Sequence, residues 1–406
     1  MSGPCSYDEA LDRLLGVTAP QPTLRLPLAQ AGGLFLAESV VARVPVPRWR
    51  SASMDGFAVH GDDIGGATPE QPVPLTLVGA TAAGGATPPR IPRGTAWRVA
   101  TGGPIPPGID SVIRQEDVTE DGAILAVRGT RDVGRNVREE GADVAVGTAV
   151  LQAGQELSAG RLALLASLAE FHPVVHRRPR VGVLTSGDEV VGPDAEDAIL
   201  DGSGIGDANQ PMLASLIHDA GGVTVPLGRV RDDPAAMVDA IQAAGDIDLL
   251  LTAGGVSVGP HDHVPSVMAA LGAEAVVHRV RIRPGGPTRV AVLPGGVPWL
   301  GLPGNPVSAF VVFLLLGRPA IRRLLGDPAA APAFHAAVLA EPVARHPTLD
   351  QFIRVTLSGD AIPRATPTGG QASWVLTSIA AADGVVRIPA GEGIVAPGSD
   401  VALLRP

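Results

Sequence analysis

The chain has 406 residues, a formal net charge of −10, 45% hydrophobic residues and 18% charged residues. This composition is typical of a globular protein, and the length predicts two to four domains rather than one core. The acidic balance argues against a general nucleic-acid binder, which normally carries a basic face. All 31 basic residues are arginine, so an arginine here can stand where a related sequence has lysine.

The sequence indicates a cytoplasmic protein with neither a membrane nor a nucleic acid as partner. Its longest apolar run, residues 309–316, is far shorter than the roughly 20 residues of a membrane helix. The first residues are polar and acidic, unlike a secretory signal. The single cysteine, Cys5, excludes an internal disulfide and fits a reducing compartment. We expect Cys5 to lie in a mobile N-terminal segment.

The first 178 residues have mostly the pattern of β structure. An apolar pattern with acids in its first turn predicts a short helix over residues 6–15. From about residue 45 to 147, short β-rich runs such as VPLTLVG, AWRVATGG, SVIRQEDV and AILAVRG alternate with Gly and Pro. Residues 157–170 predict a helix with Ser158 as its N-cap.

After residue 179 the pattern changes to alternating strands and helices. Apolar runs at 180–190, 223–230, 247–255 and 299–303 predict strands, and helical segments separate them. Such alternation predicts a parallel sheet with helices on both faces. From about residue 326 the pattern is β again, which predicts a small C-terminal barrel. The fold class expected is multidomain α/β plus β.

The expected domains follow these changes of pattern. Residues 1–45 and 140–178 form an elongated N-terminal domain, whose first helix could pack on the α/β domain, and residues 46–139 form an inserted β-rich domain. Residues 179–326 form the α/β domain, and residues 327–406 form the C-terminal β-barrel domain.

Three loops of the α/β domain are candidates for a binding site. Ligands of an open parallel sheet bind beyond the carboxyl ends of its strands, where TSGDE (185–189), TAGGVSVGPHD (252–262) and LPGNPVS (302–308) are expected. Backbone N–H groups at a helix start can bind an oxyanion. One such loop is more often a plain strand-to-helix corner. Three loops that carry Ser, Thr or Asn, two of them with acids, instead predict a site.

Other kinds of chemistry have less support. His261, Asp262 and His263 are too close in sequence to converge easily on one transition metal, and no further Cys or His cluster accompanies them. Asp262 alone could help to hold Mg²⁺. The chain has no G-x-S-x-G motif, which argues against a serine nucleophile.

Motifs along the whole chain resemble those of the MoeA family, the molybdopterin molybdenumtransferases, which include the gephyrin E-domain. They are SASMDGFAV, RVATGGPIPPGIDSVIRQED, VREEGADV, VGVLTSGDEV, LTAGGVSVGPHD, GLPGNPVSAF, FIRV and SWVLTSIAAADGVVRIP, in the family order. The resemblance implies an elongated four-domain homodimer with a central MogA-like α/β domain. It also implies insertion of molybdate into adenylylated molybdopterin with release of AMP, Mg²⁺ as cofactor, and a MogA-type adenylyltransferase as upstream partner.

The resemblance carries catalytic roles to six residues at matching positions, namely Asp55, Thr101, Asp143, Glu189, Asp232 and Asp262. Each acid also has a simpler structural explanation. Asp55 could form an Asp-Gly turn, and Glu189 and Asp232 could favour helix N-termini. Their joint occurrence in matching motifs favours the functional interpretation, with Glu189 and Asp262 as the expected Mg²⁺ ligands.

Substrate binding is carried over in the same way. The residues implied are Gly254, Gly255, Ser257, Arg279, Arg283, Pro303, Gly304, Asn305, Arg354 and Ser373, with the glycine loops holding the pterin and the arginines near molybdate. Arg279 and Arg283 look like counterparts of two family lysines, but Gly286 stands where a third would be. Asp383 stands where the family usually has Asn.

Three functions therefore remain at the level of sequence. The retained acids favour a working molybdenum insertase. The glycine at position 286 favours a pterin-binding paralogue that acts as carrier or scaffold with weak or altered insertion activity. The loops of the α/β domain alone would suggest nucleotide hydrolysis or transfer.

Overall fold

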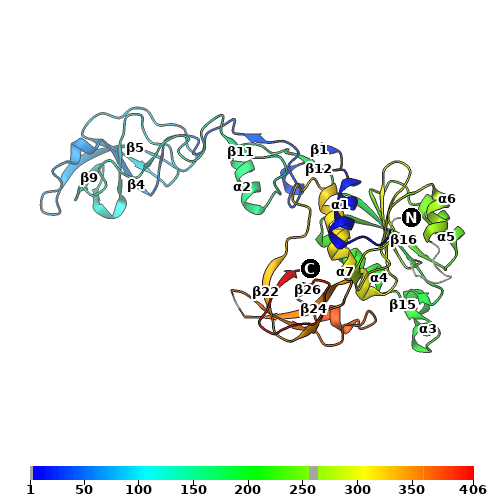
Figure 1. The fold of residues 1–406 in the computed structure, drawn as a ribbon. Coiled ribbons are helices and arrows are strands. Elements are labelled where there is room, and N and C mark those ends of the chain that lie inside the picture. The colour runs from blue at the N-terminus through cyan, green and yellow to red at the C-terminus, as the bar shows by residue number, and fades with distance from the viewer. Residues whose placement is uncertain (1–2, 256–263, 360) are drawn as a thin grey trace.

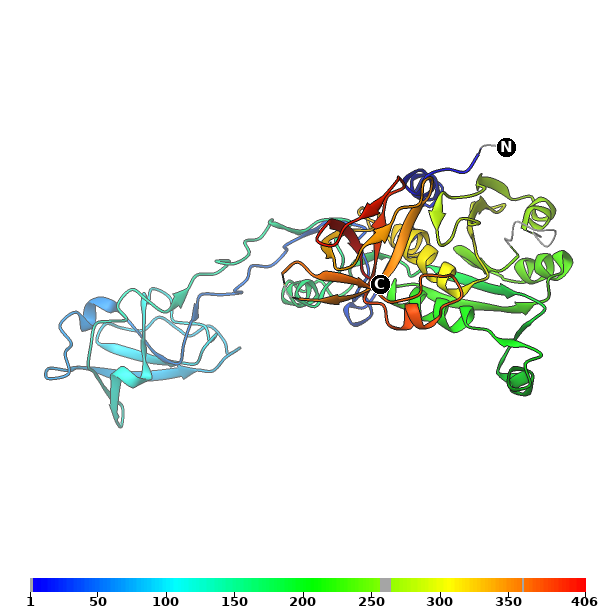
Figure 2. The same ribbon diagram turned by 60° about the horizontal axis from the view of Figure 1, so that its bottom comes forward.

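The computed structural model describes residues 3–255, 264–359 and 361–406. Figure 1 shows an elongated molecule in which a β domain lies at one end of a narrow arm. The α/β and C-terminal domains lie together at the other end, and the view in Figure 2 shows the same separation. In the described part of the chain, no helix is long and apolar enough to cross a membrane.

The β domain at the far end is a six-stranded sheet with the order β7-β4-β6-β5-β9-β8. Alternate residues of β4 bury opposite faces: Phe57 joins one apolar cluster and Ala58 joins another. The sheet is therefore covered on both sides by its own loops. Its strands are β4 (Gly56–Val59), β5 (Val73–Thr81), β6 (Thr95–Val99), β7 (Ser111–Arg114), β8 (Val118–Asp121) and β9 (Ile124–Val127).

The arm consists of the outgoing and the returning chain, paired antiparallel. Its strands are β1 (Thr23–Arg25) with β12 (Val174–His176), β2 (Val40–Val41) with β11 (Ala149–Leu151), and β3 (Ser51–Ala52) with β10 (Val137–Arg138). Helix α2 (Ala159–Ser167) follows β11. Ser158 occupies its N-cap position, as predicted, but its side chain makes no capping hydrogen bond.

Helix α1 (Tyr7–Gly16) begins with a capping box, in which the Ser6 hydroxyl accepts from the Glu9 N–H and the Glu9 carboxylate accepts from the Ser6 N–H. Its buried face lies in the core of the α/β domain and contacts α8 and β18. The expectation that Cys5 is mobile is wrong. Cys5 is 5% exposed, donates its N–H to Arg279 and accepts from the N–H of Arg281.

The α/β domain is a six-stranded sheet with the order β16-β13-β17-β21-β20-β18. The first four strands are parallel, and β20 and β18 are antiparallel additions. The strands are β13 (Arg180–Ser186), β16 (Val223–Val230), β17 (Leu249–Ala253), β18 (Glu274–Val277), β20 (Arg289–Val292) and β21 (Pro298–Leu302).

Helices cover both faces of this sheet, because alternate strand residues point to opposite sides. Leu250 packs with Met237 of α5 and Val267 of α6, whereas Leu251 belongs to the core that contains Leu213 of α4. The helices are α4 (Asn209–Asp219), α5 (Pro234–Gln242), α6 (Val264–Leu271), α7 (Pro306–Val312) and α8 (Arg318–Leu324), with a π-helical turn at Phe313–Gly317. A projecting segment contains β14 (Val190–Val191), α3 (Glu196–Leu200) and β15 (Ile205–Gly206), and its two strands pair in parallel.

The C-terminal domain is a closed barrel of five strands. Closure follows from the order β24-β25-β22-β28-β26 together with the pairing of β24 and β26. Strand β19 (Ile282–Arg283) lies in the segment that carries Arg279 and Arg283. It pairs with Asp350 and Gln351 of β24, and this pairing joins the barrel to the α/β domain. The remaining elements are β22 (His335–Leu339), β23 (Val343–Ala344), β24 (Asp350–Ser358), β25 (Arg364–Pro367), α9 (Thr377–Ala380), β26 (Gly384–Ile388), β27 (Ile394–Val395) and β28 (Asp400–Leu404).

Candidate functional site

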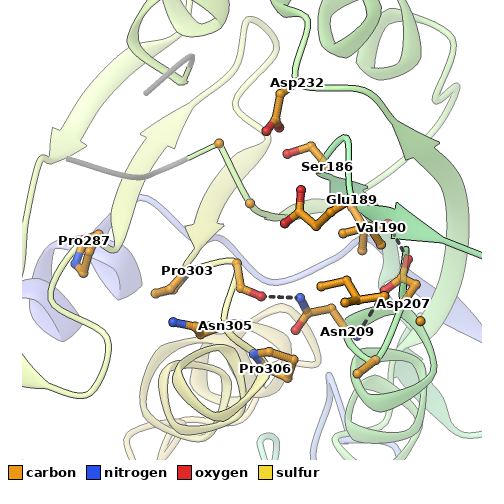
Figure 3. Close-up of a pocket in the computed structure, with 18 residues that line it drawn as sticks. Ser186, Glu189, Val190, Asp207, Asn209, Asp232, Pro287, Pro303, Asn305 and Pro306 are labelled. Atoms are coloured by element: carbon orange, nitrogen blue, oxygen red, sulfur yellow. Dashed lines mark hydrogen bonds between the residues drawn. The ribbon is translucent and has the colours of Figure 1, made fainter. Parts of the chain in front are cut away.

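A cavity of about 380 Å³ lies at the carboxyl ends of β13, β17 and β21. Parallel strands deliver the loops that follow them to one edge of the sheet, so Glu189, Gly254 and Gly304 reach the same space although they are far apart in sequence. Figure 3 shows this arrangement, with Asp232 and Ser186 beside Glu189 and with Asn305 and Asn209 across the cavity. The predicted residues brought together here are Glu189, Asp232, Gly254, Gly255, Pro303, Gly304 and Asn305.

Glycine is required at position 254 because two strand ends approach each other there. Gly254 has a φ of +106°, and a Cβ at this residue would lie 2.5 Å from the Ser186 carbonyl oxygen and 2.6 Å from its Oγ. Real Cβ atoms do not approach other atoms so closely. The glycine therefore lets the loop after β17 pass directly over the end of β13.

The loop after β21 is held from two sides. The Asn209 side chain donates from Nδ2 to the Gly304 carbonyl at 2.7 Å. Asn305 occupies the N-cap of α7 without capping it, and its Nδ2 instead donates to the Ser373 hydroxyl at 3.2 Å. Ser373 thus reaches the cavity loop from the C-terminal domain of the same chain.

Three polar atoms of the cavity lining have no hydrogen-bond partner among the described residues. They are Ser186 Oγ, Asn209 Oδ1 and Asp232 Oδ1, all three of them buried. A buried polar group without a partner costs about 1–3 kcal/mol, so such groups mark places where a ligand or water completes the bonding. Sequence reasoning did not nominate Ser186, although this residue stands in the selected loop at 185–189. It also did not nominate Asn209, which begins α4 outside the three selected loops.

The structure bears on the helix-start explanation for the two predicted cavity acids, Glu189 and Asp232. Residue 189 is followed by β14 and not by a helix, so helix-dipole placement does not explain Glu189. Helix α5 is capped by Asp233, which accepts from the Ala235 N–H, so its neighbour Asp232 is free to face the cavity. The helix-start explanation instead suits Asp207, which accepts from the N–H groups of Asn209 and Gln210 and from the Thr185 hydroxyl.

The cavity is acidic. Its lining contains Glu189, Asp207 and Asp232 but no arginine or histidine among the described residues. An anionic ligand would therefore need a cation supplied by a metal ion or by another segment. No group of three or more metal-binding side chains is found in the described ranges. Ser257 and Asp262, which we expect to bind substrate and Mg²⁺, lie outside the described residues.

The predicted arginines do not line this cavity. Arg279 and Arg283 are exposed on the segment that pairs with Cys5 and with β24, and this segment reaches the cavity only at Pro287. Gly286, one residue earlier, does not have a positive φ, and a Cβ there would face the carbonyl oxygens of Ile282 and Val280 at 3.3 and 3.5 Å. A side chain at position 286 is therefore sterically accessible with a small adjustment.

Arg354 is fully buried inside the C-terminal domain. Its Nε donates to Ser378 Oγ at 3.1 Å, and its NH2 group donates to the carbonyl oxygens of Ala372 at 3.2 Å and Gly370 at 3.5 Å. Burial lowers the pKa of Arg354 to about 10, which still leaves it charged at neutral pH. The structure therefore uses this guanidinium to hold the loop that carries Ser373.

A second group of predicted residues lies in the β domain at the far end of the arm. The Thr101 N–H and hydroxyl both donate to Asp55 Oδ1, each at 2.7 Å. These two bonds lower the pKa of Asp55, the backbone bond contributing most. Asp55 also lines a second cavity of about 310 Å³ together with Arg98 and Gln115.

The two groups are separated within one chain. Asp55 immediately precedes β4, which Figures 1 and 2 place at the opposite end of the molecule from the α/β domain. Asp143 lies near the arm, where its backbone N–H donates to Val46 and its side chain is exposed. One copy of the chain therefore does not bring Asp55, Thr101 or Asp143 to the cavity.

Asp383, which stands where the family usually has Asn, has a structural role in the barrel. Its Oδ2 accepts from the Leu357 N–H at 2.8 Å, and its own N–H donates to Val355. An asparagine carbonyl oxygen could accept the same bond. The change is therefore compatible with the barrel.

The fold and the cavity together define a multidomain small-molecule-binding protein with an α/β ligand-binding domain between a β arm and a β-barrel. Family models match the chain in three parts: the MoeA N-terminal region (domains I and II) over residues 5–169, a probable molybdopterin binding domain over 182–323, and the MoeA C-terminal region (domain IV) over 336–405.

Whole-chain relatives agree with these matches. The molybdopterin molybdenumtransferase of Nostoc sp. is 33% identical over 95% of this chain and 89% of its own length. Molybdopterin molybdenumtransferase 2 of Mycobacterium tuberculosis is 34% identical over 93% of this chain and 94% of its own. The crystal structure of the molybdopterin biosynthesis MoeA protein of Pyrococcus horikoshii superposes with a TM-score of 0.82 at 29% identity, covering 99% of both chains.

The chain belongs to the MoeA family, whose members here are named molybdopterin molybdenumtransferases. This confirms the resemblance found in the sequence and the transferase class that it implies. The predicted fold class, α/β with β-rich N-terminal domains and a C-terminal barrel, is also confirmed.

Proposed function

We propose that the protein inserts molybdate into adenylylated molybdopterin and releases AMP. The observation that carries this proposal is the α/β cavity, where three strand-end loops meet around Ser186, Asn209 and Asp232, each with a buried polar atom that lacks a partner among the described residues. Such a cavity fits a substrate rich in hydrogen-bonding groups, and relatives that match nearly the whole chain are named for this transfer. The carrier or scaffold alternative is not favoured, since the cavity keeps Glu189 and Asp232.

Mg²⁺ fits the donor set of the cavity. Oxygen ligands are what Mg²⁺ prefers, and Glu189 and Asp232 supply carboxylates of which Asp232 Oδ1 is buried without a described partner. When bound, the ion would neutralise charge on the phosphates and on the leaving AMP. Glu189 and Asp232 would hold it, with Asp262 as a third ligand by family resemblance.

The chain's own residues would bind and orient the rest of the substrate. The turns at Gly254 and Gly304 bring backbone close to the ligand, and Ser186 Oγ can donate a hydrogen bond to an oxyanion. Arg279 and Arg283 are exposed on the segment that ends at Pro287, and guanidinium groups bind oxyanions well. We assign them to molybdate, together with the Ser373 hydroxyl at the cavity loop.

A second copy of the chain would complete the site. Asp55 is held ionised by Thr101, and a lowered pKa makes it a weak general base but a good partner for a cation or a hydrogen-bond donor. Because the arm holds it away from the cavity of its own chain, we propose a homodimer in which the β domain of one subunit faces the cavity of the other. Thr101 and Asp143 would enter the site in the same way.

The substrate implies a reaction before this one. An adenylylated pterin must come from an adenylyl transfer, so we propose a MogA-type adenylyltransferase as upstream partner. The single cysteine is consistent with a reducing compartment, and we propose that the reaction takes place in the cytoplasm.

The test is mass spectrometry of protein incubated with adenylylated molybdopterin, Mg²⁺ and molybdate. We expect AMP and metal-loaded cofactor to appear together, and neither to form when molybdate is omitted. Release of AMP without metal loading, or no release with intact folded protein, would contradict the proposal.

A further inference from the structure

Trp374 is an exposed aromatic residue beside the cavity loop. Its neighbour Ser373 accepts a hydrogen bond from Asn305 of that loop, yet Trp374 itself is 76% exposed. The other three tryptophans, Trp49, Trp97 and Trp299, each donate a ring N–H bond to the protein and are at least partly buried. Trp374 is therefore the tryptophan whose ring the fold leaves available to a ligand.

The loop that carries Trp374 is held firmly. Gln371 accepts from the Arg354 N–H at 2.9 Å and donates from Nε2 to the Arg354 carbonyl at 3.1 Å. The buried Arg354 guanidinium bonds to the carbonyl of Ala372, two residues before Trp374. Helix α9, which follows the loop, contacts α7, the helix that begins at the cavity. The backbone that carries Trp374 is therefore held in place before any ligand arrives, which lowers the entropic cost of ordering this loop on binding.

The described lining of the cavity offers no aromatic ring for stacking, although it includes apolar residues such as Val190, Ile205 and Pro303. Its described lining consists of Thr, Ser, Gly, Glu, Val, Ile, Asp, Ala, Asn and Pro residues, with no aromatic ring among them. Sites for flat heterocycles normally include an aromatic or apolar face in addition to polar groups. The exposed ring at the neighbouring loop would add the aromatic face that this described lining lacks.

We propose that Trp374 stacks on a planar fused heterocycle of the substrate at the mouth of the α/β cavity. This inference rests on the proposed function, because adenylylated molybdopterin contains two such rings, the adenine and the pterin. Trp374 would set how tightly the substrate is held and in which orientation, while Ser186, Asn209 and Asp232 bond to its polar groups.

The experiment compares the wild type with Trp374→Ala, Trp374→Phe and the control Leu376→Ala, which removes a 46% exposed apolar side chain from the same loop. The primary readout is the KM for adenylylated molybdopterin in the AMP-release assay. Loss of a stacked aromatic weakens binding of a base by about 5- to 100-fold. We expect that loss for Trp374→Ala, partial rescue by Trp374→Phe, and a wild-type KM for Leu376→Ala.

Two binding probes identify the ring. Calorimetric titrations with AMP and with 6-methylpterin, on each variant, report which of the two loses affinity in Trp374→Ala. In parallel, that ring should quench tryptophan fluorescence in the wild type. Trp374→Phe still fluoresces through Trp49, Trp97 and Trp299, but it should show no quenching, because these three residues are not proposed to contact the ring.

The outcomes separate this inference from the proposed function. Wild-type protein that neither releases AMP nor binds either probe would contradict the proposed function itself. Active wild type with an unchanged KM and unchanged probe affinities in Trp374→Ala would overturn only the stacking role. Equal losses in Trp374→Ala and Leu376→Ala would also overturn it, since they would indicate a general effect of the loop.

Discussion

The β domain at the end of the arm and the α/β cavity both carry polar or charged side chains at their candidate sites. The two regions differ in whether these side chains have hydrogen-bond partners within the chain. Asp55 receives two hydrogen bonds from Thr101 of its own domain. In the cavity, polar atoms of Ser186, Asn209 and Asp232 are buried without partners among the described residues. In the β domain the carboxylate is therefore already hydrogen-bonded and charged. In the α/β cavity these polar groups still lack described partners, which a ligand would supply. Under the proposed function, the cavity binds the substrate and the β domain of a second subunit supplies a charged carboxylate to it.

Removal of either carboxylate should have the largest effect. We expect Asp55→Ala and Glu189→Ala each to lower molybdate-dependent AMP release by about 100-fold or more, since groups that act on the reacting charges contribute on this scale. Circular dichroism and light scattering should show an unchanged fold and assembly. Normal turnover in both variants would mean that the comparison has misidentified both regions.

Gly254→Ala tests the close approach of Gly254 to Ser186 at the edge of the cavity. The added Cβ would meet the Ser186 backbone oxygen at 2.5 Å, so we expect a loss of about 1–3 kcal/mol in stability and a severe loss of binding. Gly202→Ala is the matched control, because Gly202 has a φ of +81° but open space around it. It should cost only the strain of the backbone, about 1 kcal/mol. Equal thermal unfolding midpoints for the two variants would contradict the close approach.

Gly286→Lys asks whether the acidic cavity lacks a cation. Charge-assisted hydrogen bonds contribute about 1.5–3 kcal/mol, so molybdate affinity should rise about ten-fold or more. The gain should shrink at high salt, because the group is partly exposed. Molybdate titrations of both forms at two ionic strengths measure this. Unchanged affinity in a folded variant would mean that position 286 does not face the anion.

Ser186→Ala removes one polar atom of the cavity, Oγ, that has no described hydrogen-bond partner. Because its buried Oγ has no described partner to lose, we expect a stability equal to or above that of the wild type. Affinity for adenylylated molybdopterin should fall by about 3- to 10-fold, the value of one hydrogen bond. A marked loss of stability with unchanged affinity would show that Ser186 serves packing instead.

Thr101→Val should have the smallest effect. It tests whether the ionised Asp55 carboxylate, which Thr101 hydrogen-bonds, is needed for activity. It removes the hydroxyl bond to Asp55 but keeps the backbone bond, so the lowered pKa of Asp55 moves part of the way back to its ordinary value. Asp55 then becomes protonated at a higher pH than in the wild type, and the acidic limb of the pH–rate profile shifts upward. Activity near neutral pH should change little. An acidic limb that stays in place would indicate that ionised Asp55 is not required.

The sequence predicted the architecture and the edge of the sheet where the cavity lies, because strand and helix periodicities and glycine turns are local signals. It did not nominate Ser186 or Asn209. Their role depends on the approach of Gly254 and Gly304 from distant parts of the chain. The same limit applies to Arg354, whose burial depends on the barrel closing around it, and to Cys5, which is held by Arg279.

Other predictions stay open for a physical reason. Arg279 and Arg283 lie on a junction strand outside the cavity lining, so their role depends on ligand and assembly rather than on the fold of one chain. Asp55, Thr101 and Asp143 depend on assembly in the same way. Residue motifs can nominate such groups, but in the proposed dimer only the arrangement of two subunits would bring them together.

The most direct test of the central claim is complementation between Asp55→Ala and Glu189→Ala. If each site combines the β domain of one subunit with the cavity of the other, a mixed dimer contains one doubly altered site and one intact site. Unfolding and refolding the two inactive variants together should then restore about a quarter of wild-type AMP release, because half of the dimers are mixed and half of their sites are intact. Each variant refolded alone should stay inactive. Absence of restored activity in a mixture shown to contain mixed dimers would contradict a site shared between subunits.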